Sequence, residues 1–470
     1  MASSREKQRQ QKIPKGSCLQ EEAVNPQGTE GVPSFTPAQT KETTREASST
    51  QLMEKVVEKQ NMLLALRRVE FNKGAPGIDG MTVKDLRTSL NDQWTQVMQQ
   101  LLEGTYQPQP VRRVEIPKPD GGVRMLGVPT VWDRLIQQAI LQILTPIIDP
   151  DFSPSSYGFR PGRSAQSAVK QARQYIKDGY RWVVDLDLEK FFDKVNHDIL
   201  MSRLARKIGD KTILSLIRRY LQAGVMNNGC CIATEEGTPQ GGPLSPLLAN
   251  IMLDELDWEL AHRGHKFARY ADDCNIYVKS RRAGERVMES VKRFVEERLK
   301  LRVNLQKSAV DRPWRRKFLG FSFSFNKEPK IRVAPISLER FKGKVRELTC
   351  RSNGQSMAKR LEKLNTYLIG WVGYFQLADT RSIFYHLDEW VRRRLRMCLL
   401  KHWKKPKTKK RNLVSLGIPM DWAMLICCSR KGYWRLSKSP QVNKALGLAY
   451  WQSQGLRSLS TRYDKLRSTS

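Results

Sequence analysis

Residues 266–280 read KFARYADDCNIYVKS and place Asp272 and Asp273 side by side between two short apolar stretches. Adjacent like charges repel each other, so this pair needs an environment that compensates them. A solvated hairpin turn is one such environment, because Asp is common in turns. A divalent cation is another, because hard cations take oxygen ligands. The stretch therefore predicts a hairpin with two carboxylates at its turn, and it leaves water and metal as alternatives.

A second acidic stretch, RWVVDLDLEKFFDKVNHD, covers residues 181–198. Its apolar residues alternate with Asp185 and Asp187, and alternate residues of a strand share one face. An acidic face requires water, partners or metal, so this is not a simple core strand. If the strand lies beside the 266–280 hairpin, carboxylates from two elements can hold two divalent ions for phosphoryl displacement.

The charge balance points to a polyanionic partner. The chain of 470 residues carries 82 Lys and Arg against 47 Asp and Glu, a formal net charge of +35. Nucleic acid fits this excess because each neutralised phosphate releases counterions. No stretch approaches 18 uncharged apolar residues, which argues against a membrane partner. The eight cysteines lack zinc or disulfide spacing and indicate free thiols in a reducing compartment. These features predict metal-dependent nucleic-acid chemistry, with polymerase and nuclease both open.

The periodicity along the chain predicts an α+β fold followed by a helical region. Residues 1–50 are rich in polar residues and proline and indicate a flexible tail. Alternating residues on both sides of PDGG, 119–122, predict a hairpin. The segment GTPQGGPLSPLLANIMLDELD, 237–257, predicts a tight turn before a helix. Beyond 335 the patterns are helical and basic, and residues 391–411 carry eleven Lys or Arg and no acid, which favours contact with nucleic acid.

The chain resembles the reverse transcriptases encoded in group II introns, the intron maturases, over roughly residues 55–460. The resemblance rests on motifs that occur in the family's order: NKGAPGIDGMT, IPKPDGGVRMLGVPTVWDRLIQQAI, SSYGFRPGRSAQSAV, VVDLDLEKFFDKVNHDIL, GTPQGGPLSPLLANIMLDELD, RYADDCNIYVKS, LKLRVNLQKSAV and KFLGFSF. It implies a right-hand polymerase with fingers and palm at 51–335. An α-helical thumb or X domain at 336–411 and a small, mostly helical DNA-binding domain at 412–470 would follow.

The resemblance also assigns roles to individual residues. It implies a catalytic metal-binding triad of Asp187, Asp272 and Asp273, with the Leu188 carbonyl as a further metal contact and Asp185 as a bystander. The residues implied to hold the incoming nucleotide are Lys118, Arg124, Phe192, Gln240 and Lys307, and Phe192 would reject a ribose 2′-hydroxyl. The residues expected to contact nucleic acid in the basic tract are Arg392, Arg393, Arg394, Arg396, Lys401, Lys404 and Lys405.

The activity implied is RNA-directed DNA synthesis with two Mg²⁺ ions and dNTP substrates. The expected partners are a group II intron RNA, whose splicing the protein would assist, and a DNA target with its primer. We expect a bacterial cytoplasmic protein, nucleoid-associated when it acts on DNA, without the H-N-H endonuclease of longer family members and hence without second-strand nicking. A reverse transcriptase serving diversity generation or CRISPR spacer acquisition stays open as an alternative, as does a splicing factor that only binds RNA.

Overall fold

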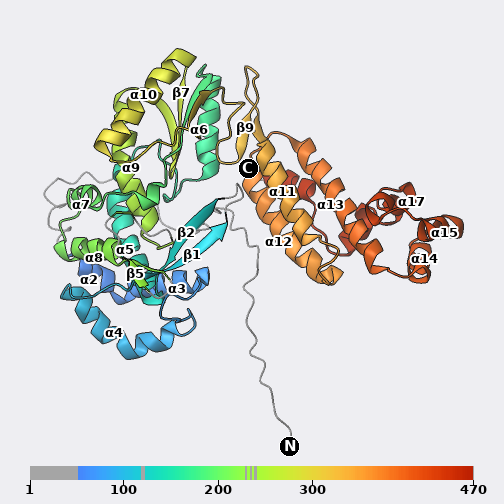
Figure 1. The fold of residues 1–470 in the computed structure, drawn as a ribbon, viewed down its shortest axis with the longest axis horizontal. Helices are drawn as coiled ribbons and strands as arrows, with labels where there is room; N and C mark the ends of the chain where they lie inside the picture. The colour runs from blue at the N-terminus through green and yellow to red at the C-terminus, as the bar shows by residue number, and fades with distance from the viewer. Residues whose placement is uncertain (1–50, 118–121, 228–229, 233–235, 238–240, 469–470) are drawn as a thin grey trace, which may run out of the picture. The chain divides into compact units, whose positions relative to one another are not determined.

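The computed structural model describes residues 51–117, 122–227, 230–232, 236–237 and 241–468 (Figure 1). The chain forms two compact units, and neither is continuous in sequence. Unit 1 comprises residues 1–165, 190–258 and 299–301. Unit 2 comprises residues 166–189, 259–298 and 302–470. Both helices and sheets are present, as the α+β prediction requires.

Unit 1 combines a four-stranded sheet with helices. The sheet has the order β2-β1-β4-β5, and its strands are β1 (Val111–Pro117), β2 (Val123–Val128), β4 (Val225–Asn227) and β5 (Cys230–Ile232). Strands β1 and β2 pair antiparallel from Arg112↔Val128 to Pro117↔Val123, which confirms the hairpin predicted around PDGG. The helices are α2 (Leu52–Val57), α3 (Lys59–Asn72), α4 (Leu86–Leu102), α5 (Val131–Ile148), α7 (His197–Ala205) and α8 (Lys211–Gln222).

Helix α5 forms the centre of the unit 1 core. Most of its side chains are buried, and α2 and α3 pack against it. Its first turn is capped by Thr130, whose hydroxyl accepts a hydrogen bond from Asp133 N and donates one to Asp133 Oδ2. Tyr106 also donates to Asp133 at 2.9 Å, so this carboxylate is satisfied although it is 1% exposed. Burial raises the pKa of Asp133, and these hydrogen bonds oppose the rise.

Unit 2 contains a second four-stranded sheet, with the order β6-β7-β3-β8. Its strands are β3 (Trp182–Leu186), β6 (Lys266–Tyr270), β7 (Asp273–Val278) and β8 (Ala309–Asp311). All neighbouring pairs are antiparallel, and the middle of the sheet is apolar and buried. Helix α10 (Arg281–Arg298) packs on β3, β7 and β8. The hairpin predicted for 266–280 and its pairing with the acidic strand are both confirmed.

A helical region follows a small hairpin of β9 (Phe321–Phe323) and β10 (Ile331–Val333). Its long helices are α11 (Pro335–Leu348), α12 (Met357–Phe375) and α13 (Arg381–His402), and its short ones are α14 (Pro406–Ser415), α15 (Met420–Cys428), α16 (Tyr433–Leu436), α17 (Pro440–Ala445), α18 (Leu448–Ser453) and α19 (Leu459–Ser468). The aromatic rings of Phe341, Phe375 and Phe384 surround Trp371, at centroid distances of 4.5 to 5.8 Å. This core confirms the helical character predicted beyond residue 335.

The last helix, α19, packs against the long helices of this region. Asp388 of α13 accepts hydrogen bonds from the main-chain N–H groups of Leu459 and Ser460 at 2.8 and 2.9 Å. A carboxylate at this position satisfies N–H groups that the start of α19 leaves without helical partners. The Tyr463 ring stacks on Phe384 with a centroid distance of 4.3 Å. The C-terminal helices are thereby joined to α13.

Candidate active site

The two adjacent aspartates lie at a two-residue turn between β6 and β7. Tyr270 pairs with Asp273, so Ala271 and Asp272 form the turn. Ala271 has a φ of +55°, a left-handed conformation that is uncommon for a residue with a side chain. Buried Arg269 donates to the Ala271 carbonyl oxygen at 2.9 Å and fixes this turn. Unusual backbone held by its surroundings is concentrated at functional sites.

The pairing of β3 with β7 brings the second acidic segment to this turn. The register runs from Trp182↔Val278 to Leu186↔Cys274. If this antiparallel register is continued by one residue, forward from Leu186 and back from Cys274, Asp187 falls opposite Asp273. Asp187 is half-buried and Asp273 is exposed. The sheet therefore gathers the main chain of all three predicted triad residues at one end of two neighbouring strands.

The segment after β3 is held by the loop 303–308. Ser308 Oγ accepts a hydrogen bond from Asp187 N at 2.9 Å, and Asn304 N donates to Asp187 O at 2.9 Å. Leu188 forms an isolated bridge with Val303. Lys307 belongs to this loop and its side chain is exposed. The structure thus brings the loop that carries Lys307 to the same end of the sheet as Asp187 and Leu188.

Asp185, the acidic residue left out of the predicted triad, is paired with an arginine. Arg316 donates to its Oδ2 from Nε at 2.9 Å and from Nη2 at 2.6 Å. Arg316 also donates to the Lys307 carbonyl oxygen at 2.7 Å. Burial raises the pKa of Asp185, Arg316 opposes the rise, and the charge of Asp187 adds to it. The sequence did not predict Arg316; the only signal was the basic run around Trp314.

The described residues contain no group of three His, Cys, Asp or Glu side chains gathered closely enough to hold a metal ion. The chemistry of the acidic end nevertheless fits a hard cation, because carboxylate and carbonyl oxygens are the donors that Mg²⁺ and Ca²⁺ take. The triad's role as metal ligand remains a prediction.

The remaining nucleotide-pocket candidates belong to unit 1. Arg124 lies exposed on β2, and Phe192 is half-buried in the short 3-10 helix Phe191–Asp193. Lys118 and Gln240 lie outside the described residues. The glycines on either side of Gln240 are described: a Cβ on Gly237 would lie 3.1 Å from Phe192 O, and one on Gly241 would lie 2.6 Å from Gly127 O on β2.

These close approaches explain the glycines of the 237–242 segment. Gly237 and Gly241 have φ values of +96° and +133°, which disfavour any residue with a Cβ. Gly237 N also donates to Val195 O at 2.8 Å. Unit 1 therefore packs Gly237 against the main chain of Phe192 and Asp193, and Gly241 against β2. Helix α9 (Ser245–His262) follows, as predicted.

The basic tract 391–411 is used partly inside the protein. Arg396 is 5% exposed, and it donates to Ser437 O at 2.9 Å and to Leu446 O at 3.3 Å. Arg394 donates to Thr349 Oγ1 at 2.9 Å, and Arg393 donates to Trp434 O at 3.2 Å. These contacts give the three arginines structural roles that the charge pattern did not reveal. Of the predicted nucleic-acid contacts, Arg392 and Lys401 are half-buried, whereas Lys404 and Lys405 are exposed.

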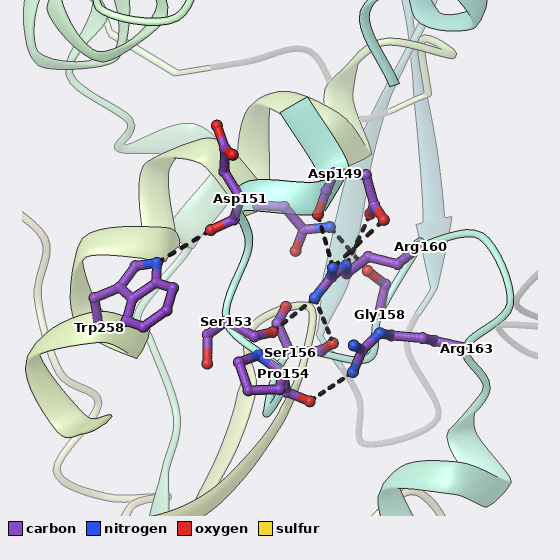
Figure 2. A network of polar contacts seen from close by, with 10 residues as sticks. Asp149, Asp151, Ser153, Pro154, Ser156, Gly158, Arg160, Arg163 and Trp258 are labelled. Carbon is purple, nitrogen blue, oxygen red and sulfur yellow. Dashed lines mark hydrogen bonds and ion pairs between the residues drawn. The ribbon is translucent and has the colours of Figure 1, made fainter. Parts of the chain in front are cut away.

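The SSYGFRPGR motif forms a buried polar network in unit 1. Figure 2 shows the Arg160 side chain directed at Asp149 and at the main chain of Ser153 and Ser156. Arg160 is 7% exposed and lies 2.8 Å from Asp149 Oδ1. Phe159, the preceding residue, is 50% exposed and has a φ of +57°. The sequence indicated this motif only through the family resemblance. The hydrogen bonds of Arg160 show its structural role.

Comparison with known proteins agrees with this architecture. Residues 116–323 match the family described as "Reverse transcriptase (RNA-dependent DNA polymerase)", and residues 338–417 match "Group II intron, maturase-specific domain". Protein YkfC of Escherichia coli is 36% identical over 286 residues, which cover 52% of this chain and 75% of YkfC. Group II intron-encoded protein LtrA of Lactococcus lactis is 44% identical over 174 residues, which cover 37% of this chain and 29% of LtrA.

Among solved structures, a chain of a partial Cas6-RT-Cas1–Cas2 complex matches with 30% identity and a TM-score of 0.35. The match covers 53% of this chain and 43% of that chain.

The polymerase match and the mixed α+β structure define the class of protein: an RNA-directed DNA polymerase. With the maturase-specific domain that follows, the chain belongs to the group II intron reverse transcriptases and maturases. Among the described residues, no helix is long and apolar enough to span a bilayer.

Proposed function

We propose that this chain copies its group II intron RNA into DNA at a DNA target by target-primed reverse transcription, and that it assists splicing of the same RNA. One observation carries the catalytic part of the proposal. The pairing of β3 with β7 sets Asp187 beside the turn that bears Asp272 and Asp273, while Asp185 is neutralised by Arg316. A separate partner for Asp185 supports the choice of Asp187 for the triad.

The triad would hold two Mg²⁺ ions, with the Leu188 carbonyl as a further ligand. When bound, such a pair of ions activates the attacking hydroxyl and stabilises the leaving oxygen of an in-line displacement. The protein's own contribution is to fix the carboxylates. Arg269 holds the turn through Ala271, and the 303–308 loop holds the main chain of Asp187 on both sides of its peptide.

The nucleotide would be bound by the residues that the family resemblance names for this role. Arg124 and Lys118 would neutralise the triphosphate, whose negative charge increases during phosphoryl transfer. Gln240 would line the base and sugar pocket, and Lys307 would contact a phosphate of primer or nucleotide. The close packing of Gly237 against Phe192 and of Gly241 against β2 supports a common pocket for Phe192, Gln240 and Arg124.

The helical region would bind the nucleic acids. Residues 336–411 would act as the thumb and residues 412–470 as the DNA-binding domain, with intron RNA, target DNA and primer as partners. The match to the maturase-specific domain over 338–417 supports an RNA role for this region. We place the protein in the bacterial cytoplasm, close to the nucleoid when it acts on DNA.

Primer extension tests the polymerase directly. With an annealed RNA template and DNA primer, we expect extension with Mg²⁺ and dNTPs and none after chelation with EDTA, because the carboxylates alone cannot stabilise the developing charge. Restoring excess Mg²⁺ should restore synthesis. Tight RNA binding without extension under any divalent cation would contradict the polymerase and favour the binding-only splicing factor.

Substitution of Phe192 tests the nucleotide pocket. We expect Phe192→Ala to raise incorporation of ribonucleotides relative to deoxynucleotides by about 10- to 100-fold, because the removed ring no longer occupies the space of the 2′-hydroxyl. Single-nucleotide extension with GTP and dGTP measures this ratio. Phe191→Leu is the matched control, since Phe191 is 2% exposed, lies in the core and should leave the selectivity unchanged. An unchanged ratio in Phe192→Ala would remove Phe192 from the pocket.

A further inference from the structure

The ring of Tyr433 lies among three cations that come from separate segments. The Lys409 Nζ of α14 is 5.3 Å from the ring centroid, the Lys401 Nζ of α13 is 5.7 Å away, and the Arg351 Cζ after α11 is 6.0 Å away. We call Tyr433, Arg351, Lys401 and Lys409 the Tyr433 cluster. In the described part of the chain, no salt bridge joins any of its cations to a carboxylate. The three positive charges therefore lie around one ring with no carboxylate paired to any of them among the described residues.

Lys409 is the most unusual member of the cluster. It is 7% exposed, and lysine is almost never this buried unless it is paired. Its ammonium makes no hydrogen bond to any described residue. The Tyr433 ring attracts the ammonium but carries no negative charge that would neutralise it. Burial raises the pKa of the Cys427 thiol although Lys409 opposes the rise, so this thiol supplies no negative charge to Lys409. The Lys409 stem is therefore buried while its ammonium has no partner in the described part of the chain, which leaves it able to bind an anion from outside the chain.

The surroundings of the cluster are also positively charged. Arg393 lies over the Trp434 ring at 3.8 Å, and its Nε has no hydrogen-bond partner among the described residues. Burial lowers the pKa of Arg396 to about 10, and the charges of Arg392 and Arg393 act in the same direction. Exposed Lys404 and Lys405 extend the positive surface to the residues just before α14. A row of charges of this kind matches a ligand with regularly repeated negative charges.

We propose that the Tyr433 cluster binds a backbone phosphate of a nucleic acid strand. The cations occupy the surroundings of the Tyr433 ring, so the contact is made to the phosphate rather than by stacking on a base. Binding at this site is therefore independent of sequence. The anion compensates the cations of α13, α14 and the segment after α11 together, which fixes these three segments to one another. The inference specifies a contact within the nucleic-acid binding that the proposed function assigns to this region.

Salt-dependent binding by the full chain tests the site. Labelled hairpin RNA and labelled duplex DNA of the same sequence are titrated by fluorescence anisotropy over a range of salt concentrations. Each lost phosphate contact reduces the slope of log K against log salt by about 0.9 and weakens binding about fivefold near physiological salt. We expect Lys409→Met to lose one contact and Lys401→Met with Lys409→Met to lose two. A loss with RNA, with DNA or with both supports the site and identifies its ligand.

The matched control is Lys407→Met, an exposed lysine on the same helix. A loss in Lys407→Met as large as in Lys409→Met would overturn the site in favour of a diffuse positive surface. An unchanged slope with both probes in the double variant would overturn it as well.

Thermal unfolding without nucleic acid separates a binding role from a structural one. Met keeps the buried apolar stem of Lys409 and removes only its charge, so the Tm of Lys409→Met should be unchanged, whereas a structural lysine would lower both Tm and affinity. If Lys409→Met unfolds, the slope of log K against log salt is measured with Lys401→Met alone, because Lys401 is only half-buried. Extension of a saturating primed template by the wild type and by Lys409→Met separates the two proposals: failure in both contradicts the polymerase but not the Tyr433 cluster.

Discussion

We expect Asp273→Ala to abolish cDNA synthesis while RNA binding and the fold are retained. Asp273 begins β7 and is exposed, so its removal leaves no cavity in the sheet. Loss of a metal-binding carboxylate would remove several kcal/mol of charge stabilisation from the transition state, which slows the reaction about a thousandfold or more. Primer extension on an RNA template and filter binding of the same RNA measure the two properties in parallel.

Asp178→Ala is the matched control for this experiment. Asp178 is exposed in the same unit, immediately after helix α6 (Ala165–Lys177), and within the described part of the chain its carboxylate accepts a hydrogen bond only from Gln174. Its removal should leave cDNA synthesis unchanged. Extension by Asp273→Ala within about tenfold of the control would show that the triad assignment is wrong, because one of its three carboxylates would then be dispensable.

The second large effect is expected at Arg160, where the consequence is loss of stability. Arg160 donates to Asp149 Oδ1 at 2.8 Å, to Asp149 O at 2.8 Å and to Ser153 O at 2.7 Å (Figure 2). Arg160→Ala removes the partner of a part-buried carboxylate and takes one hydrogen bond from each of these two carbonyl oxygens, which keep the main-chain donors Phe152 N and Ser156 N. We expect the free energy of unfolding to fall by about 3–5 kcal/mol. Chemical denaturation followed by circular dichroism measures the change.

Two further variants test whether the loss of stability comes from the buried network of Arg160. Arg160→Lys should rescue little, because one ammonium cannot reproduce the planar fork that serves the carboxylate and the carbonyls together. Arg163→Ala removes a neighbouring arginine whose guanidinium donates to Pro154 O at an exposed position. We expect it to lower stability by about 1 kcal/mol or less. Equal destabilisation by Arg160→Ala and Arg163→Ala would contradict the role of the buried network.

The alternation of residues along the sequence predicted the two hairpins and the acidic strand. Alternating residues around PDGG and around Asp272 predicted two hairpins, and both are present. The acidic strand was recognised because the two-residue period puts Asp185 and Asp187 on one face. Its place beside the 266–280 hairpin was a hypothesis on which the site depended, and the pairing with β7 confirms it.

Contacts between distant segments could not be predicted from such patterns. Arg316 neutralises Asp185 across more than a hundred residues of sequence, and the basic run around Trp314 does not indicate which carboxylate its arginines contact. The basic tract was predicted to contact nucleic acid as a whole, because a sequence shows charge but not the direction of each side chain. Arg396 in fact satisfies carbonyl oxygens of the segment that follows α16. A guanidinium has five donors, so arginine serves buried carbonyls as readily as external phosphates.

The position of β3 within its sheet has a consequence for synthesis on the ribosome. Strand β3 lies between β7 and β8, and both partners are translated after it. At ordinary elongation rates, roughly ten seconds pass between the emergence of β3 and that of β8. During this interval the nascent chain carries an apolar strand with open edges, the kind of segment that pairs wrongly with other chains. The β6-β7-β3-β8 sheet is therefore completed only after β8 has been translated, and premature termination before residue 309 yields a product in which one edge of β3 has no partner strand.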